Sequence, residues 1–322
     1  MQARRAFAKS EFCRLGRIEF TAEAIREFAA AYDPQPQHLD DQAARATPLQ
    51  GLAASGWQTC AVVMRHVELN LLSGSAHLRI AGIDEIRWLK PVRPGDVLEA
   101  RISWEPECVC TGCNDAGGRA IAIEVVNHLN LPVLRLNGYA TSERDWASPA
   151  NEQRLCVRRP VRSSRVPRRP GGRLVRYFDD VDVGDEIALG SYDFTPDAMH
   201  AFTRIVGAVH GGGERFNASG WHVIAAWMRR IVDHYDAEAD FLAHRDRPVP
   251  RLGPAVGARS LTWLKPVRAG DRITFNSWAE HKVKIGTSRE WGLLVAGAEG
   301  RDQNGELVVS LYPQFLLQKR PT

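Results

Sequence analysis

Two nearly identical stretches decide the fold of this chain: "WLKPVRPGD" at residues 88–96 and "WLKPVRAGD" at residues 263–271, which match at eight of nine positions. Two further blocks recur in the same order. "FTAEAIREF" at 20–28 matches "FTPDAMHAF" at 194–202, and "ASGW" occurs at both 54–57 and 218–221. Three repeated blocks in one order indicate a tandem duplication, so both halves are expected to have the same fold.

Each copy begins with a pattern that predicts a short amphipathic helix. Thr21 is a suitable N-cap and Pro34 ends the helix. The apolar face between them consists of Ile25, Phe28, Ala29 and Tyr32. A second helix is predicted to start at Ser55 and Gly56, and because it is apolar on most sides we expect it to be buried against a sheet.

The rest of each copy alternates apolar and polar residues between turn signals, which predicts antiparallel strands. In the first copy these segments are 82–92, 96–106, 119–129 and 131–143, and in the second 260–267, 272–283, 289–300 and 306–319. One long buried helix with four or more antiparallel strands predicts an α+β layer fold in each half.

The chain has 322 residues, enough for two domains. We expect an N-terminal domain at 1–146, a linker at 147–172 and a C-terminal domain at 173–322. The region between the copies is basic, since residues 154–176 contain nine arginines and no acid. Its prolines and paired glycines favour an extended linker, and contact with an anion such as a nucleotide phosphate or nucleic acid is the alternative.

Composition points to an ordinary globular protein. Hydrophobic residues make up 44% and charged residues 25% of the chain, and there is neither an apolar run of membrane-spanning length nor the apolar core of a signal peptide. Six cysteines in a chain of this length do not resemble a secreted disulfide framework. We therefore expect a cytoplasmic protein with reduced thiols that binds neither membranes nor nucleic acid.

The motifs "FTAEAIREFAAAYDPQPQHLD", "GLAASGWQT" and "GIDEIRWLKPVRPGDVLEARI" together resemble the MaoC-like (R)-specific enoyl-CoA hydratase/dehydratase family. This resemblance covers most of both halves. It implies two tandem hotdog folds, each an antiparallel sheet wrapped around a central helix, that form one internal pseudo-dimer. Two such pseudo-dimers could also associate as a homodimer.

The family's hydratase motif maps onto Asp33, Gln35, Pro36 and His38. One position departs from the pattern, because Gln37 stands where the family usually has a bulky apolar residue before the histidine. The departure concerns the shape of the pocket more than the chemistry. The residues expected to contact substrate are Gln35, Pro36, Gln37, Ser55 and Trp57.

Hydration of an enoyl thioester requires a base, a proton source for Cα and stabilisation of the enolate oxygen. An imidazole such as that of His38 suits the first two tasks, and the Asp33 carboxylate can orient the attacking water. The two prolines between these residues can hold them together in a turn. The N–H of Gly56, unpaired at a helix start, is the candidate oxyanion donor, as the resemblance also implies.

The second copy lacks this dyad. Gly207 stands in register with Asp33, and twelve positions separate it from Ser219, whereas twenty-two separate Asp33 from Ser55. His210 remains nearby without an aspartate. We expect this half to be catalytically inactive and either to complete an acyl-binding tunnel, as the resemblance implies, or simply to cover an edge and apolar face of the first half.

The sequence thus predicts a hydro-lyase that interconverts trans-2-enoyl-CoA and (3R)-3-hydroxyacyl-CoA, with coenzyme A as part of the substrate and no other cofactor. A non-catalytic acyl-CoA-binding scaffold and a hotdog thioesterase remain the alternatives. No metal site is expected: Cys108, Cys110 and Cys113 lie close together but lack the usual paired spacing, and "GGGE" at 211–214 lacks the flanking elements of a nucleotide loop.

Overall fold

The computed structural model describes residues 13–69, 78–104, 119–142, 167–207, 217–286 and 288–321. The strands of the first half are β1 (Cys13–Phe20), β2 (Leu78–Trp88), β3 (Asp96–Trp104), β4 (Arg119–Val126) and β5 (Pro132–Ser142). Those of the second half are β6 (Arg169–Pro170), β7 (Asp185–Asp193), β8 (Leu252–Trp263), β9 (Arg272–Val283), β10 (Trp291–Arg301) and β11 (Leu307–Gln318).

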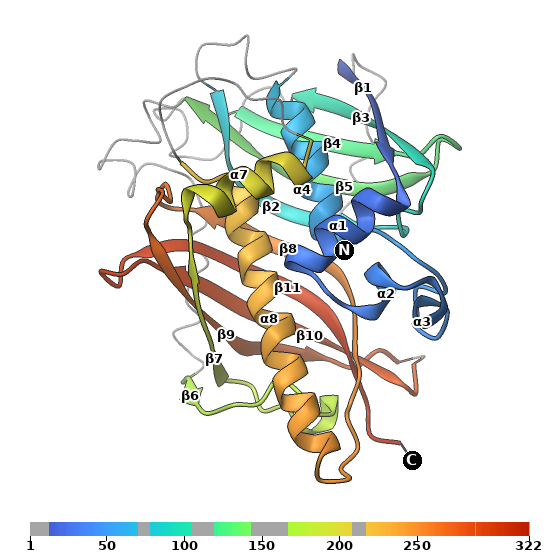
Figure 1. The fold of residues 1–322 in the computed structure, drawn as a ribbon, viewed down its shortest axis with the longest axis vertical. Helices are drawn as coiled ribbons and strands as arrows, with labels where there is room; N and C mark the ends of the chain where they lie inside the picture. The colour runs from blue at the N-terminus through green and yellow to red at the C-terminus, as the bar shows by residue number, and fades with distance from the viewer. Residues whose placement is uncertain are drawn as a thin grey trace.

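All of these strands form one curved sheet, in the order β1-β3-β4-β5-β2-β8-β11-β10-β9-β7-β6 (Figure 1). Every neighbouring pair is antiparallel except β6 and β7. From the centre of the sheet outward, corresponding strands of the two halves follow in the same order. The first half has β2, β5, β4, β3 and β1, and the second half has β8, β11, β10, β9 and β7. The two halves meet where β2 pairs with β8, from Gly82 opposite Thr262 to Arg87 opposite Gly257.

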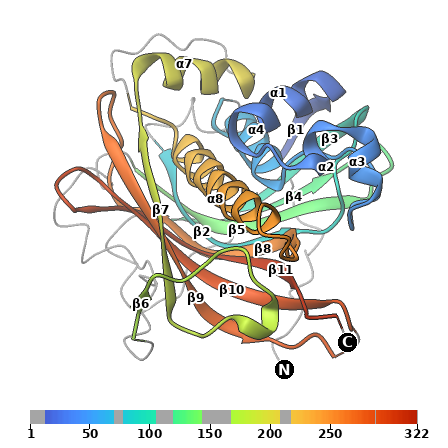
Figure 2. The same ribbon diagram turned by 60° about the horizontal axis from the view of Figure 1, so that its bottom comes forward.

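The helices lie on one face of this sheet (Figure 2). The first half supplies α1 (Ala22–Tyr32), α2 (Pro36–Leu39), α3 (Asp41–Arg45) and α4 (Gly56–Val67), and the second half supplies η2 (Phe178–Asp180), α7 (Pro196–Ile205) and α8 (Gly220–Ala243). The main apolar core is continuous through both halves. No helix in the described ranges is long and apolar enough to cross a membrane.

The local predictions agree closely with these elements. Thr21 caps α1 by accepting a hydrogen bond from the Ala24 N–H, and the buried face of α1 is the predicted one: Ile25, Phe28, Ala29 and Tyr32. All eight predicted strand segments overlap observed strands, and the α+β hotdog prediction is confirmed. Three strands were not predicted: β1 and β7, which precede the first helix of each half, and the two-residue β6, which lies within the predicted linker.

The predicted strand over 82–92 extends too far, since β2 ends at Trp88. The segment after it contains Pro91, which has no N–H to donate to a sheet. The same correction applies to the second half, where β8 ends at Trp263 and its start lies earlier than predicted, at Leu252.

The repeated tryptophan and the repeated glycine are in direct contact in each half. The Trp88 indole N–H donates a hydrogen bond of 3.0 Å to the Gly56 carbonyl, and Trp263 does the same to Gly220 at 2.9 Å. A Cβ on either glycine would lie 2.6 Å from the indole ring. Glycine is therefore required at both helix starts, because any side chain would displace the tryptophan.

The end of the repeated stretch forms a tight turn that contacts the first block. The Asp96 carboxylate accepts a hydrogen bond of 2.7 Å from the Arg93 N–H, and Gly95, at φ +85°, donates one of 2.8 Å to the Phe20 carbonyl. In the second half, the Gly270 N–H donates the equivalent hydrogen bond to the Phe194 carbonyl, at 2.9 Å. Glycine suits this position because positive φ is unfavourable for other residues.

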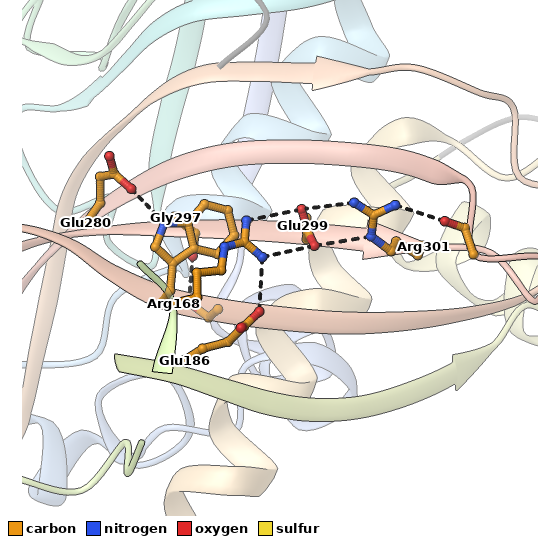
Figure 3. A network of polar contacts seen from close by, with 9 residues as sticks. Arg168, Glu186, Glu280, Gly297, Glu299 and Arg301 are labelled. Carbon is orange, nitrogen blue, oxygen red and sulfur yellow. Dashed lines mark hydrogen bonds and ion pairs between the residues drawn. The ribbon is translucent and has the colours of Figure 1, made fainter. Parts of the chain in front are cut away.

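The end of the predicted linker contacts the second half. Figure 3 shows the Arg168 guanidinium between two carboxylates, Glu186 on β7 at 3.0 Å and Glu299 on β10 at 3.2 Å. It also lies 3.7 Å from the centre of the Trp278 ring, and Arg301 is a second partner of the buried Glu299 carboxylate. These contacts connect residue 168 to the sheet of the second half. The rest of the arginine-rich region, up to residue 166, lies outside the described residues.

A fully buried histidine lies between the two halves. The His222 ring on α8 stacks on Phe202 with 4.5 Å between ring centroids, and it lies edge-on to Tyr32 of the first half. Its Nε2 atom is 3.4 Å from the hydroxyls of both Tyr32 and Tyr192. Burial disfavours the charged imidazolium and lowers the pKa of His222 from 6.5 to about 3.

Because His222 is buried in its neutral form, we expect the free energy of unfolding to fall in acid. Above pH 6.5 the histidine is neutral in both states, whereas between pH 6.5 and 3 only the unfolded chain binds the proton, so unfolding becomes easier as the pH falls. The contribution amounts to at most about 5 kcal/mol. Gln58 occupies the position of His222 in the first half, so His222→Gln introduces a residue that the fold already contains there. We expect this variant to reduce the slope of the unfolding free energy against pH, as measured by urea denaturation.

His244→Gln provides the control, because this histidine is exposed at the end of α8. For this variant, the slope of the unfolding free energy against pH should match that of the wild type. Equal slopes for His222→Gln and the wild type would show that His222 contributes nothing to acid sensitivity.

Candidate active site

Asp33 lies at the point where α1 ends. Its N–H donates to the Ala29 carbonyl at 2.9 Å, and its backbone leaves the helical region at φ −148°. The side chain is only 4% exposed. Its carboxylate accepts two hydrogen bonds, one of 2.6 Å from the Ser55 hydroxyl and one of 2.8 Å from the Gln35 amide. These two donors satisfy acceptor positions of the buried carboxylate, as expected for a polar group in the interior.

His38 lies on the single helical turn α2, which starts at Pro36. Proline suits the first position of a helix, so the second proline of the segment begins a new turn in place of extending α1. The His38 ring is buried, and its Nδ1 atom is 2.7 Å from the Ala53 carbonyl. Because a carbonyl only accepts, Nδ1 carries the proton, and Nε2 of the neutral ring has a free lone pair.

Asp33 and His38 converge as the sequence predicted. The Nε2 atom of His38 is 3.6 Å from Oδ2 of Asp33. This distance is longer than an ordinary hydrogen bond, and at such a distance a water molecule can contact both atoms. One water molecule can therefore bind to the imidazole and the carboxylate together.

Ser55 and Gly56 begin α4 beside the dyad. The Ser55 oxygen accepts a hydrogen bond from the Trp57 N–H and caps the helix, while its hydrogen goes to Asp33. Among the described residues, the Gly56 N–H donates no hydrogen bond. The positive end of the α4 dipole thus carries an unpaired donor close to the two candidate catalytic side chains.

These residues line a cavity of about 270 Å³ between the two halves. The first half contributes polar groups and the start of α4. The second half contributes an apolar wall from three elements: Trp227, Met228 and Ile231 of α8, residues 252–256 around the start of β8, and Pro313 and Phe315 of β11. The polar side of the cavity therefore comes from the first half, whereas the apolar wall comes from both copies of the repeat, since Leu49, Trp57 and Val133 also line the cavity.

Most of that wall could not be assigned from the sequence. The duplication suggested that the second copy completes a tunnel, but no motif identifies residues such as Trp227 or Phe315. The Ala53 carbonyl that orients His38 was also not predicted, since a backbone acceptor has no residue signature. Trp88 was prominent only as part of the repeat, and it too lines the cavity.

The other predicted contact residues lie around this cavity. Gln35 and Gln37 line it, as does Trp57, whose ring is 4.9 Å from that of Trp88 and 5.8 Å from that of Trp227. Pro36 lines an adjoining cavity of about 190 Å³. Ser55 lies on the wall of the main cavity, and its hydroxyl donates a hydrogen bond to the Asp33 carboxylate.

The second half retains the helix start but not the dyad. Ser219 caps α8 as Ser55 caps α4, whereas Gly207, in register with Asp33, lies in a turn after α7 at φ +72°. His210 and the glycines at 211–213 lie outside the described residues, as do Cys108, Cys110 and Cys113. In the described ranges, no group of three or more His, Cys, Asp or Glu side chains is arranged to hold a metal.

Comparisons with known proteins agree with this architecture. The model of the MaoC-like domain matches residues 10–115, which include the whole segment from Asp33 to Gly56. A protein described as a MaoC domain dehydratase from Chloroflexus aurantiacus is similar over 98% of this chain and 97% of its own length, with 14% identity and a TM-score of 0.68.

Two further solved structures share the fold. A conserved hypothetical protein from Mycobacterium tuberculosis with a double hotdog fold covers 96% of both chains, with 12% identity and a TM-score of 0.61. The peroxisomal multifunctional enzyme type 2 of Drosophila melanogaster is similar over 94% of this chain and 48% of its own length, with 11% identity and a TM-score of 0.51.

No curated protein sequence matches the chain. The domain match and the full-length structural similarities together cover both halves of the molecule. The chain therefore carries a MaoC-like domain in its first half and has, over its whole length, the double hotdog fold.

Proposed function

We propose that this protein is a hydratase/dehydratase that interconverts trans-2-enoyl-CoA and (3R)-3-hydroxyacyl-CoA. The observation that carries the proposal is the convergence of His38 Nε2 and Asp33 Oδ2, 3.6 Å apart, in the cavity that contains the Gly56 N–H. The MaoC-like domain supports the reaction class. The (3R) configuration and the CoA thioester follow from the resemblance described above.

In the hydration direction, a water molecule lies between Asp33 and His38. The carboxylate accepts a hydrogen bond from one water hydrogen, and Nε2 removes the other as the water oxygen attacks C3 of the enoyl group. The electron pair of the double bond moves toward the thioester oxygen. The resulting imidazolium then returns its proton to C2, so that one water is added across the double bond.

The thioester oxygen gains negative charge during this step. A hydrogen bond from the Gly56 N–H, together with the dipole of α4, stabilises that charge. The carbonyl of Ala53 keeps the proton of His38 on Nδ1, which leaves Nε2 free to act as the base. Ser55 and Gln35 hold the Asp33 carboxylate in its orientation toward the water.

Substitution of either dyad member should strongly reduce turnover. We expect Asp33→Asn and His38→Gln each to lower kcat for a short enoyl-CoA by about 100- to 10,000-fold, because each removes a proton-transfer or water-orienting group. The reaction is followed by loss of the conjugated enoyl absorbance. Melting temperatures measured in parallel report whether the fold is retained.

Asp197→Asn and His281→Gln are matched controls, since both residues are exposed and lie in the second half. They should retain wild-type turnover. Full activity in either dyad variant, or release of free thiol in place of hydration by the wild type, would contradict the proposal; the second result would indicate a thioesterase.

The two helix-start glycines allow catalysis to be separated from stability. Gly56→Ala and Gly220→Ala place a Cβ at the same 2.6 Å from an indole ring, so each should lower the free energy of unfolding by about 1–3 kcal/mol. Only Gly56→Ala disturbs the oxyanion donor, and we expect it alone to lower kcat/KM, by about 100-fold. Equal activity losses in both variants would assign the effect to packing.

A further inference from the structure

The dyad is the end of a chain of side-chain hydrogen bonds that leads to Gln37. The Gln35 Nε2 group donates to Asp33 Oδ1 at 2.8 Å, and the Gln37 Nε2 group donates to Gln35 Oε1 at 2.9 Å. Gln37 is 8% exposed and is the residue that departs from the family pattern, which usually has an apolar side chain here. A buried amide in place of an apolar group calls for a polar partner.

The carboxylate determines the orientation of both amides. An ionised carboxylate only accepts hydrogen bonds, so Gln35 must turn its NH₂ group toward Asp33 and its oxygen toward Gln37. Gln37 must then turn its own NH₂ group toward Gln35. Its carbonyl oxygen therefore faces away from the chain, and no described residue donates a hydrogen bond to it. An accessible acceptor on the cavity wall is thus left for a ligand.

Gln37 lies where two cavities meet. The main cavity and the adjoining one share five lining residues: Gln35, Gln37, Leu49, Leu252 and Pro254. Beyond them, the adjoining cavity is lined by Tyr235 and Trp291 and by one charge of each sign, Asp236 and Arg251. Arg251 is already paired with Glu290. A neutral hydrogen-bond donor suits this mixture better than a carboxylate or an ammonium group.

The proposed reaction gives the direction of the substrate. The thioester carbonyl, C1, lies at the Gly56 N–H, and the attacked carbon, C3, lies at Asp33 and His38. The chain beyond C3 therefore leaves the reacting atoms on the side of Asp33, where Gln35 and Gln37 follow. The acyl group, and not the pantetheine arm, passes the free oxygen of Gln37.

We propose that the protein acts on acyl groups that carry a hydroxyl beyond C3, and that this hydroxyl donates a hydrogen bond to Gln37 Oε1. The inference rests on the proposed hydratase function and adds the substrate class. A plain alkyl chain at the same place buries the Gln37 oxygen without a partner. Because such an unsatisfied acceptor is unfavourable, discrimination of about tenfold or more is expected.

The test compares binding of paired saturated acyl-CoAs, which need no turnover. Heptanoyl- and octanoyl-CoA are compared with analogues bearing one hydroxyl at each position from C5 to the chain end, by isothermal titration calorimetry. We expect one hydroxylated analogue to bind wild type at least about tenfold more tightly than its plain counterpart. In Gln37→Met, which keeps the side-chain size but lacks the acceptor, the ratio of the two dissociation constants should fall to near one.

The ratio cancels any general effect of the variant on the dyad, since both ligands experience it. Gln42→Met, exposed on α3, should keep the wild-type ratio. A ratio near one for every analogue with wild type, or an unchanged preference in Gln37→Met, would overturn the inference.

Turnover of the matching enoyl-CoAs distinguishes this inference from the proposed function. Hydration of plain and hydroxylated enoyl-CoAs with equal kcat/KM would contradict the role of Gln37 while leaving the hydratase proposal intact. A hydroxyl preference in binding with no turnover of any enoyl-CoA would contradict the hydratase proposal and leave Gln37 as a specificity-determining residue of a binding site.

Discussion

The contact between an indole and a glycine at the start of a buried helix is the constraint on which the rest of this structure depends. In each half the tryptophan at the end of a central strand donates to the first helical carbonyl, and its ring fills the space where a side chain would otherwise lie. The contact fixes the helix start relative to the sheet. It thereby also fixes where the unpaired N–H groups of that helix point.

The same scaffold has two uses in this protein. Both halves contain the capped helix start, the glycine turn and the first amphipathic helix, and the aromatic rings of Tyr32, Phe202 and His222 pack between them. Only the first half has the segment that carries Asp33 and His38. The second half instead presents apolar residues of α8 and β8 to the cavity and so extends its apolar wall.

The polar side of the cavity is organised by one buried carboxylate. Asp33 accepts from Ser55 and Gln35, and Gln37 is oriented in turn through Gln35. His38 is held separately, by a backbone carbonyl. The arrangement keeps an imidazole, a carboxylate oxygen and a helix N–H at one place, and it leaves the Gln37 oxygen available further along the same wall.

The sequence by itself determined the duplication and most of the elements, because these depend on local patterns: periodicity, a threonine cap, two prolines and three repeated blocks. The dyad was inferred from the family resemblance, since its local pattern alone is also that of a surface turn. Strands β1 and β7 escaped prediction since each forms only by pairing with a distant strand. Tertiary structure alone decided the joining of the halves through β2 and β8, the Ala53 acceptor and the apolar wall of the cavity. These features arise from contacts between residues far apart in the chain, and no local pattern records such contacts.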